Sequence, residues 1–235
     1  MLTRHLPNAV TCLNVASGVL AIIFASRGEA PMAGLPAWQW GFIFICIAAV
    51  ADFLDGFVAR LLHAYSDMGK ELDSLCDLVS FGVAPAILLF NCMEANETLP
   101  WLKWLAVLIP VAGALRLAKF NIDTRQTTSF IGLPIPANAI FWIGFVALVR
   151  QQEVSFLCQW YWFVPLVLLE SWLMVSEVPL FSLKFKTWGW AGNERRWLLI
   201  AAAVVLVFCL GWSGLLWLII FYVALSLTAR PQQRQ

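Results

Sequence analysis

The sequence predicts an all-α fold, a polytopic transmembrane helical bundle of six core helices plus two C-terminal helices. Of its 235 residues, 61% are apolar and only 12% are Asp, Glu, Lys or Arg, whereas roughly a quarter of an ordinary soluble domain is charged. No linker, repeat or low-complexity tract interrupts the chain, so residues 1–235 are expected to form a single transmembrane domain. A helix needs about 20 predominantly apolar residues to span a bilayer, and eight segments come near this length: 7–26, 38–62, 70–93, 99–120, 134–150, 157–175, 196–211 and 213–229.

The first three segments carry polar residues at helical spacing. Asn8, Thr11 and Asn14 recur every three residues in the first segment, which predicts a helix with a polar face turned toward the bundle. The end of the second segment and the start of the third share the stretch 52–77, which holds five aspartates and one glutamate. So many carboxylates in so apolar a chain are the strongest indication of function.

The later segments are more uniformly apolar. Pro134 and Pro136 favour a helix start at the fifth segment, because proline has a fixed φ and lacks a donor that the first turn does not need. The last two segments are separated only by Gly-Trp-Ser-Gly at 211–214. That spacing is compatible with a tight hairpin of two spans or with one long bent helix.

The basic residues predict the orientation, because Lys and Arg concentrate on the cytoplasmic side of membrane proteins. With eight spans and both termini in the cytoplasm, only Arg27, Lys103 and Arg150 fall on the outer face. We therefore expect a protein of the cytoplasmic (inner) membrane whose acidic stretch faces the cytoplasm. Twelve basic residues then lie at the inner face: Arg4, Arg60, Lys70, Arg116, Lys119, Arg125, Lys184, Lys186, Arg195, Arg196, Arg230 and Arg234.

Four aspartates are placed to converge. Asp52 and Asp55 are spaced i, i+3, and Asp73 and Asp77 are spaced i, i+4, so each pair shares one face of its helix. Each charge costs about 2.5–3.5 kcal/mol to insert at the centre of a membrane helix, and four neighbouring anions also repel one another. Hard divalent cations such as Mg²⁺ bind clustered carboxylates together with substrate phosphates. The sequence therefore predicts a metal-assisted reaction at a phosphate group.

Small residues and one cation accompany these carboxylates. Gly56 leaves the helix surface open beside Asp55, Ala59 extends that groove by one turn, and Arg60 offers a planar fork of donors that suits phosphate. The alternative is that the small residues, Gly69 above all, allow close helix packing. Asp67 and Glu71 lie in or beside the turn between the helices and are expected to be solvated surface charges.

The spacing D-x2-D-G-x2-A-R-x8-G-x3-D-x3-D, from Asp52 to Asp77, resembles the signature of the CDP-alcohol phosphatidyltransferases. Further stretches resemble one branch of that family, the integral-membrane CDP-diacylglycerol–serine O-phosphatidyltransferases, also called phosphatidylserine synthases. The resemblance runs from about residue 6 to residue 140. The stretches are Leu6-Pro7-Asn8 with Thr11 and Asn14, the run from Asp77 to Pro85, the run from Leu115 to Asn121, and the run from Gly132 to Ala137.

The resemblance implies an activity and a set of roles. The phosphatidyl group of CDP-diacylglycerol would pass to the hydroxyl of L-serine with release of CMP, supported by two divalent ions, Mg²⁺ or Mn²⁺. It implies that Asp52, Asp55 and Asp73 hold metal and that Asp77 contacts the second ion and acts as general base. Family members are also expected to form homodimers. The implied CDP site consists of Gly56, Ala59, Arg60 and Gly69, closed by Asn8 and Thr11 from the first helix.

The serine site is assigned from chemistry, because an amino acid needs a cation for its carboxylate. Arg116, at the cytoplasmic end of the fourth segment, is the best cation available, and Asn121 is expected to support the pocket. For Lys119 and Arg125 a role in setting the topology is an equally good interpretation. No Ser, Cys or His within the signature offers an evident covalent nucleophile, so a single displacement is expected.

Other functions fit the sequence less well. Glycerol 3-phosphate or inositol phosphate could replace serine as the acceptor, but a phosphorylated acceptor calls for a denser basic cluster. A cation transporter could use the carboxylates, although transporters tend to show internal repeats and broken helices at the midplane. A net charge of +1 with no basic stripe argues against nucleic acid. The six cysteines show no C-x-x-C spacing and are expected to be small hydrophobic residues.

Overall fold

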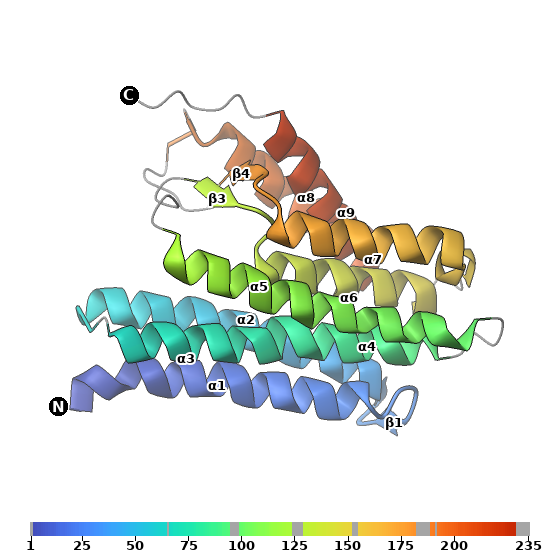
Figure 1. The fold of residues 1–235 in the computed structure, drawn as a ribbon, viewed down its shortest axis with the longest axis horizontal. Helices are drawn as coiled ribbons and strands as arrows, with labels where there is room; N and C mark the ends of the chain where they lie inside the picture. Colours follow the sequence, from blue (N-terminus) through green and yellow to red (C-terminus); the bar gives the residue numbers. More distant parts are fainter. Residues whose placement is uncertain are drawn as a thin grey trace.

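In the computed structural model the chain is a bundle of helices with two very short two-stranded sheets (Figure 1). The structure describes residues 2–64, 66–94, 99–123, 129–151, 155–181, 189–190 and 192–228. Arg125, Lys184 and Lys186 lie outside the described residues, as do the basic residues at 230 and 234.

All eight predicted segments are helical, and the helix bounds agree with the predicted ones to within a few residues. The first five segments correspond to α1 (Leu2–Ala25), α2 (Ala37–Leu61), the continuous helix formed by α3 (Asp67–Asp77), η1 (Leu78–Val83) and α4 (Ala84–Met93), then η2 (Pro100–Val107) with α5 (Leu108–Ile122), and α6 (Ile135–Gln151). The last three correspond to η3 (Ser155–Cys158) with α7 (Trp160–Val175), α8 (Glu194–Leu210), and η4 (Gly211–Ser213) with α9 (Gly214–Leu227).

Length and apolar composition support a membrane protein. Within the described residues, four helical stretches are long and apolar enough to cross a bilayer: Pro7–Ala25, Ala37–Leu61, Asp67–Met93 and Pro100–Ile122. A fifth apolar stretch, Glu194–Leu227, has the length as well but is divided at Gly211 into α8 and α9. The helices α6 and α7 are equally apolar but shorter, with 17 and 16 residues.

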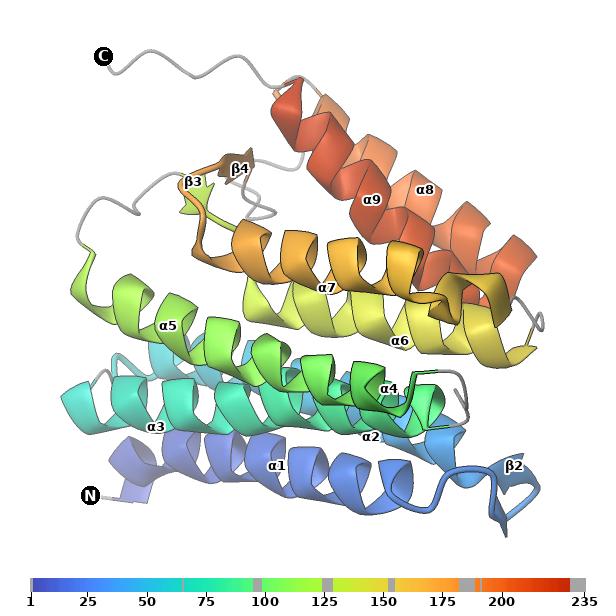
Figure 2. The same ribbon diagram turned by 45° about the vertical axis from the view of Figure 1, so that its right-hand side comes forward.

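The helices form layers around α6 (Figures 1 and 2). α1, α2 and the helix from α3 to α4 make one side of the bundle, α5 and α7 pack beside them, and α9 packs against α6. α6 is the most buried helix, with Phe141, Trp142 and Phe145 all at 1% exposure or less. Gly144 on this helix meets the backbone of Leu216, so α9 can approach α6 only because residue 144 has no side chain.

The question left open for residues 196–229 is resolved in favour of a hairpin. Gly211 ends α8 with a φ of 60°, a backbone conformation that glycine adopts without steric cost. Arg195 at the start of α8 donates to the carbonyl oxygen of Thr228 at the end of α9, at 3.3 Å. The two helices are therefore antiparallel neighbours, as Figure 2 shows.

The loops gather at the two ends of the bundle. One end holds the start of α1, the turn between α2 and α3, the end of α5 and the antiparallel pair β3 (Ser129–Ile131) and β4 (Pro179–Phe181), in which Phe130 faces Leu180. The opposite end holds the hairpin of β1 (Pro31–Met32) and β2 (Leu35–Pro36). There Arg150 pairs with Glu29, and Lys103 pairs with Glu94 at 2.9 Å.

The described basic residues separate between these ends as the sequence predicts. Arg60, Lys70, Lys119 and Arg195 lie at the end that carries β3 and β4, whereas Arg27, Lys103 and Arg150 lie at or near the other. The direction of insertion in the membrane stays a prediction.

Candidate active site

Three aspartates meet where α2 and α3 face each other. Asp52 and Asp55 project from α2 and Asp73 from α3, and each offers a carboxylate oxygen within 4.8 Å of those of the other two. The spacings i, i+3 on one helix and the short turn between two antiparallel helices bring them together. The carboxylates expected to converge therefore do so, with the exception of Asp77, which is not part of this group of three.

The first helix reaches the cluster through Thr11. Its hydroxyl donates a 2.6 Å hydrogen bond to Oδ2 of Asp55 and also lies 3.1 Å from the carbonyl oxygen of Pro7. Thr11 and Asp55 are both buried. Because the bond fixes one carboxylate oxygen, α1 helps to orient the cluster that α2 and α3 supply.

Asp77 lies one turn deeper on α3 and has a partner of its own. Asn14 of α1 donates from Nδ2 to Oδ1 of Asp77 at 3.0 Å, and the hydroxyl of Ser80 donates to the carbonyl oxygen of Asn14 at 3.0 Å. Asp52 and Asp73 are close enough to act on Asp77 electrostatically. Asp77 is thus a neighbour of the cluster, held by α1 in a fixed position.

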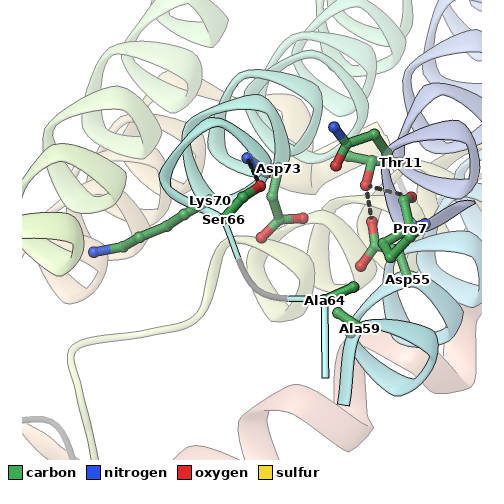
Figure 3. Close-up of a pocket in the computed structure, with 11 residues that line it drawn as sticks. Pro7, Thr11, Asp55, Ala59, Ala64, Ser66, Lys70 and Asp73 are labelled. Carbon is green, nitrogen blue, oxygen red and sulfur yellow. Dashed lines mark hydrogen bonds between the residues drawn. The ribbon is translucent and has the colours of Figure 1, made fainter. Parts of the chain in front are cut away.

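A pocket of about 220 Å³ opens beside the cluster, between α1, α2 and α3. Figure 3 shows the carboxylates of Asp55 and Asp73 directed into the same space, with Thr11 between α1 and Asp55, while the side chain of Lys70 points away from both carboxylates. The lining combines small residues with polar ones: Pro7, Asn8, Thr11, Asp55, Gly56, Ala59, Ala64, Ser66, Gly69, Lys70 and Asp73.

The two glycines of the signature differ in what surrounds them. A Cβ on Gly56 would meet nothing within 4 Å, so this glycine is not needed for helix packing and its surface faces open space. A Cβ on Gly69 would lie 3.0 Å from Oγ of Ser66 and 3.2 Å from Oδ1 of Asn8. The backbone N–H of Gly69 donates to Ser66, the N-cap residue of α3. Gly56 therefore shapes the pocket, and Gly69 allows the close approach of Asn8.

The basic residues predicted for the site, Arg60 and Arg116, and the predicted supporting residue Asn121 lie in different parts of the structure. Arg60 is exposed in the last turn of α2 and does not line the pocket. Arg116 of α5 is 7% exposed, its Nε has no hydrogen-bond partner among the described residues, and Asp77 and Tyr222 act on it electrostatically. The side-chain amide of Asn121 donates to Oγ of Ser74 at 3.0 Å, and its backbone carbonyl oxygen accepts from Nζ of Lys70 at 2.8 Å, so Asn121 joins the end of α5 to α3.

The residues of the cluster fit a divalent metal. Their donor atoms are all carboxylate oxygens, which Mg²⁺ and Mn²⁺ prefer. Oδ1 of Asp73 is buried and has no hydrogen-bond partner among the described residues. A buried anionic oxygen without a partner costs free energy unless a cation or a donor reaches it.

Sequence reasoning missed several residues at or near the site. Asn14 was expected to lie on a polar face of its helix. Its hydrogen bond to Asp77 joins residues 63 positions apart, and no local sequence pattern predicts such a contact. Ser66 was also missed, although a Ser three residues before Gly69 is a recognisable N-cap signal. Glu170 in α7 is 4% exposed but does not line the pocket; as a lone acid in an apolar segment it is a feature that the sequence alone could have singled out.

Comparison with known proteins gives the family. The model of the CDP-alcohol phosphatidyltransferase family matches residues 4–183, a longer stretch than the motifs indicated. A protein of Methanocaldococcus jannaschii named CDP-diacylglycerol–serine O-phosphatidyltransferase is 39% identical over 169 residues, covering 72% of this chain and 70% of that protein.

Bacterial proteins of the same name match over similar lengths. The protein of Mycobacterium leprae is 37% identical over 74% of this chain, but the match spans only 57% of that protein's length. The protein of Helicobacter pylori strain 26695 is 32% identical over 86% of this chain and 81% of that protein. The chain belongs to the CDP-alcohol phosphatidyltransferase family.

Proposed function

We propose that the chain transfers the phosphatidyl group of CDP-diacylglycerol to the hydroxyl of L-serine and releases CMP. The observation that carries the proposal is the convergence of three carboxylates on a pocket at one end of an apolar bundle. The relatives named above carry this activity in their names, which favours serine over other acceptors.

Asp52, Asp55 and Asp73 would hold divalent cations, Mg²⁺ or Mn²⁺, with Asp77 completing the site for a second ion. When bound, the ions neutralise the substrate diphosphate and polarise the phosphoryl group under attack. Thr11 keeps one oxygen of Asp55 engaged, so the chain itself limits which carboxylate oxygens are available.

The pocket would receive the CDP portion of the donor. Gly56 exposes helix backbone to the pocket, and Ala59 adds only a small side chain. Gly69 lets Asn8 approach closely. The pocket has room for a diphosphate next to the carboxylate cluster. The nucleoside would then lie along the small residues. Arg60, at the exposed end of α2, is available to the outer part of the nucleotide.

Asp77 would act as general base. Asn14 donates to Oδ1, so Oδ2 is the oxygen left to take the proton of the serine hydroxyl as it attacks phosphorus. A single displacement follows, with serine oxygen entering and CMP leaving. Rapid exchange of labelled CMP into CDP-diacylglycerol without serine would contradict this step.

Arg116 would bind the serine carboxylate. It is buried, its Nε has no acceptor in the part of the chain that the structure describes, and it lies within electrostatic reach of Asp77. A serine held there would present its hydroxyl toward the general base. Asn121 would support the pocket indirectly, because its side chain is bonded to Ser74. In this proposal the site faces the cytoplasm from the inner membrane, and two copies of the chain form a homodimer.

The decisive experiment measures CMP release from CDP-diacylglycerol by the purified protein with Mn²⁺ or Mg²⁺. Serine, glycerol 3-phosphate and inositol phosphate are compared, and Asp77→Asn is the matched variant. Release that depends on serine, metal and Asp77 supports the proposal. Release with another acceptor alone would keep the mechanism and replace the acceptor, and no release with any acceptor would favour a cation transporter.

A second experiment tests the serine site. Arg116→Ala is expected to raise the KM for serine by about tenfold or more, because a lost charged contact costs roughly 1.5–3 kcal/mol, with a smaller change in the KM for CDP-diacylglycerol. Lys119→Ala is the control, because Lys119 is engaged with Val175 and Glu177 on α7 and its loop. An unchanged KM for serine in Arg116→Ala would contradict the assignment.

A further inference from the structure

Three polar residues join α3 to α5 at the end of the bundle that carries the acidic cluster. Nζ of Lys70 donates to the backbone carbonyl oxygen of Asn121 at 2.8 Å, and the side-chain amide of Asn121 donates to Oγ of Ser74 at 3.0 Å. Oγ of Ser74 donates in turn to the backbone carbonyl oxygen of Lys70 at 3.2 Å. The three hydrogen bonds form a closed circuit between the two helices. We call Lys70, Ser74 and Asn121 the α3–α5 bridge.

The bridge serves the end of α5. Asn121 lies in the last turn of this helix, which ends at Ile122, and the last four carbonyl groups of an α-helix have no partner within it. A cation at this end also interacts favourably with the helix dipole. Lys119 acts on the end of α7 in the same way, by donating to the carbonyl oxygen of Val175 at 3.3 Å. Lys70 therefore gives the end of α5 a donor that comes from a neighbouring helix.

The side chain of Lys70 turns away from the acidic cluster. Lys70 and Asp73 are spaced i, i+3 on α3, a spacing at which a lysine can pair with an aspartate. Lys70 belongs to the lining of the pocket, yet Figure 3 shows its side chain directed away from the carboxylates of Asp55 and Asp73. Its amino group bonds to α5 instead. The positive charge at the rim of the pocket therefore holds a helix and not the cluster.

A second contact fixes α5 deeper in the bundle, where the helix lies directly against η1. A Cβ on Gly82 would lie 3.4 Å from Cα of Pro110, so the two backbones approach closely there. Arg116 lies between this contact and the bridge, five residues before Asn121 or about 7.5 Å along the helix axis. The helix α5 is thus held on both sides of Arg116.

The bridge is equally close to the carboxylates of α3. Ser74 directly follows Asp73 and precedes Asp77 by three residues, so Asp77 lies less than one helical turn beyond it. The bridge therefore links the helix that carries Asp77 to the helix that carries Arg116.

We propose that Lys70, Ser74 and Asn121 are positioning residues that set the separation between Arg116 on α5 and Asp77 on α3. The inference rests on the proposed function, because that function assigns Arg116 to the serine carboxylate and Asp77 to the proton of its hydroxyl. A looser bridge lets the end of α5 move away from α3, and serine is then held at a changed distance from the general base. Misplacement of a reacting group by about 1 Å can slow a reaction about a hundredfold. The three carboxylates of the acidic cluster come from α2 and α3 and stay in place.

The kinetics of CMP release test the positioning role. Lys70→Met keeps the apolar stem and removes the donor, and Ser74→Ala removes the partner of the Asn121 amide. Each should lower kcat/KM for serine about fivefold or more, as expected for one lost hydrogen bond, while Mn²⁺ affinity and the KM for CDP-diacylglycerol stay near their wild-type values. Lys70→Arg keeps a cationic donor and should restore most of the activity. Glu71→Gln is the matched control, because Glu71 is the exposed neighbour of Lys70.

Hydrogen exchange tests the bridge without any turnover. In the full-length protein, amides in the last turn of α5 should exchange about threefold faster or more in Lys70→Met and Ser74→Ala, because a released helix end opens more often. Exchange in α2 should not change, and Glu71→Gln should match the wild type. The double variant Ser74→Ala with Asn121→Ala should lose no more activity than Ser74→Ala alone, because both substitutions remove the same hydrogen bond.

Three results would overturn the inference. Wild-type exchange at the end of α5 in both variants would show that the bridge does not hold the helix. Faster exchange with unchanged kcat/KM for serine would show that the bridge holds α5 without positioning the acceptor. A loss confined to the KM for CDP-diacylglycerol would assign Lys70 to the donor site. A wild-type protein that releases no CMP with serine would instead overturn the proposed function, and the positioning role with it, even where the exchange data confirm the bridge.

Discussion

The hydroxyl of Thr11 lies 2.6 Å from Oδ2 of Asp55, so the first helix holds one carboxylate of the acidic cluster directly. Thr11→Val keeps the shape of the side chain and removes the donor. We expect kcat/KM for CDP-diacylglycerol to fall about tenfold, because a hydrogen bond to a charged group contributes roughly 1.5–3 kcal/mol. Thr11→Ser keeps the hydroxyl and should retain most of the activity. Equal losses in both variants would show that packing, not the hydrogen bond, matters at this position.

Substitution by alanine should raise the stability of the protein at Gly56 and lower it at Gly18. Gly56→Ala adds a methyl group into open space and should stabilise α2 by up to about 1 kcal/mol, while raising the KM for CDP-diacylglycerol because the methyl group enters the pocket. In Gly18→Ala the new Cβ meets the side chain of Ser80, and overpacking costs typically 1–3 kcal/mol. Thermal unfolding and steady-state kinetics on both variants test this, and an unchanged KM in Gly56→Ala would mean that this surface does not contact the donor.

Asn14 positions Asp77 through a 3.0 Å hydrogen bond. In Asn14→Ala the carboxylate loses its donor, so we expect kcat to drop about tenfold or more while the KM for CDP-diacylglycerol changes little. The measurement is the full serine and CDP-diacylglycerol dependence of CMP release. Ser17→Ala is the control, because Ser17 is also buried on α1. A loss confined to KM would assign Asn14 to substrate binding instead.

Metal binding can be measured apart from turnover. Asp52→Asn and Asp73→Asn should each weaken Mn²⁺ binding about tenfold or more, because each removes one anionic ligand from a group of three. Binding is measured without lipid substrate, from the electron paramagnetic resonance signal of free Mn²⁺. Asp67→Asn is the matched control, since Asp67 is exposed in the first turn of α3. Chelation should abolish CMP release, and Mg²⁺ or Mn²⁺ should restore it. Wild-type affinity in both cluster variants would contradict a metal site here.

The sequence was sufficient for features that depend on local spacing. Apolar length predicted the eight helical segments among the described residues. The spacing of the aspartates predicted that Asp52, Asp55 and Asp73 converge, because residues three or four apart share a helix face whatever lies around them. Contacts between distant segments were not predictable in this way. The bond from Asn14 to Asp77 depends on how α1 crosses α3. The hairpin of α8 and α9 depends on the backbone angle of one glycine, Gly211, which composition does not reveal.

The wide π-helical turn from Leu78 to Val83 joins the acidic helix α3 to the apolar helix α4 without a break. A π turn holds more residues than an α turn, and each residue added to or removed from a helix rotates everything beyond it by about 100°. Deleting one residue here would turn Leu88 and Leu89, both at 1% exposure or less, away from the bundle while Asp73 and Asp77 stayed in place. The number of residues in this stretch is therefore fixed, because one continuous helix has to present a polar site at one end and an apolar core surface at the other.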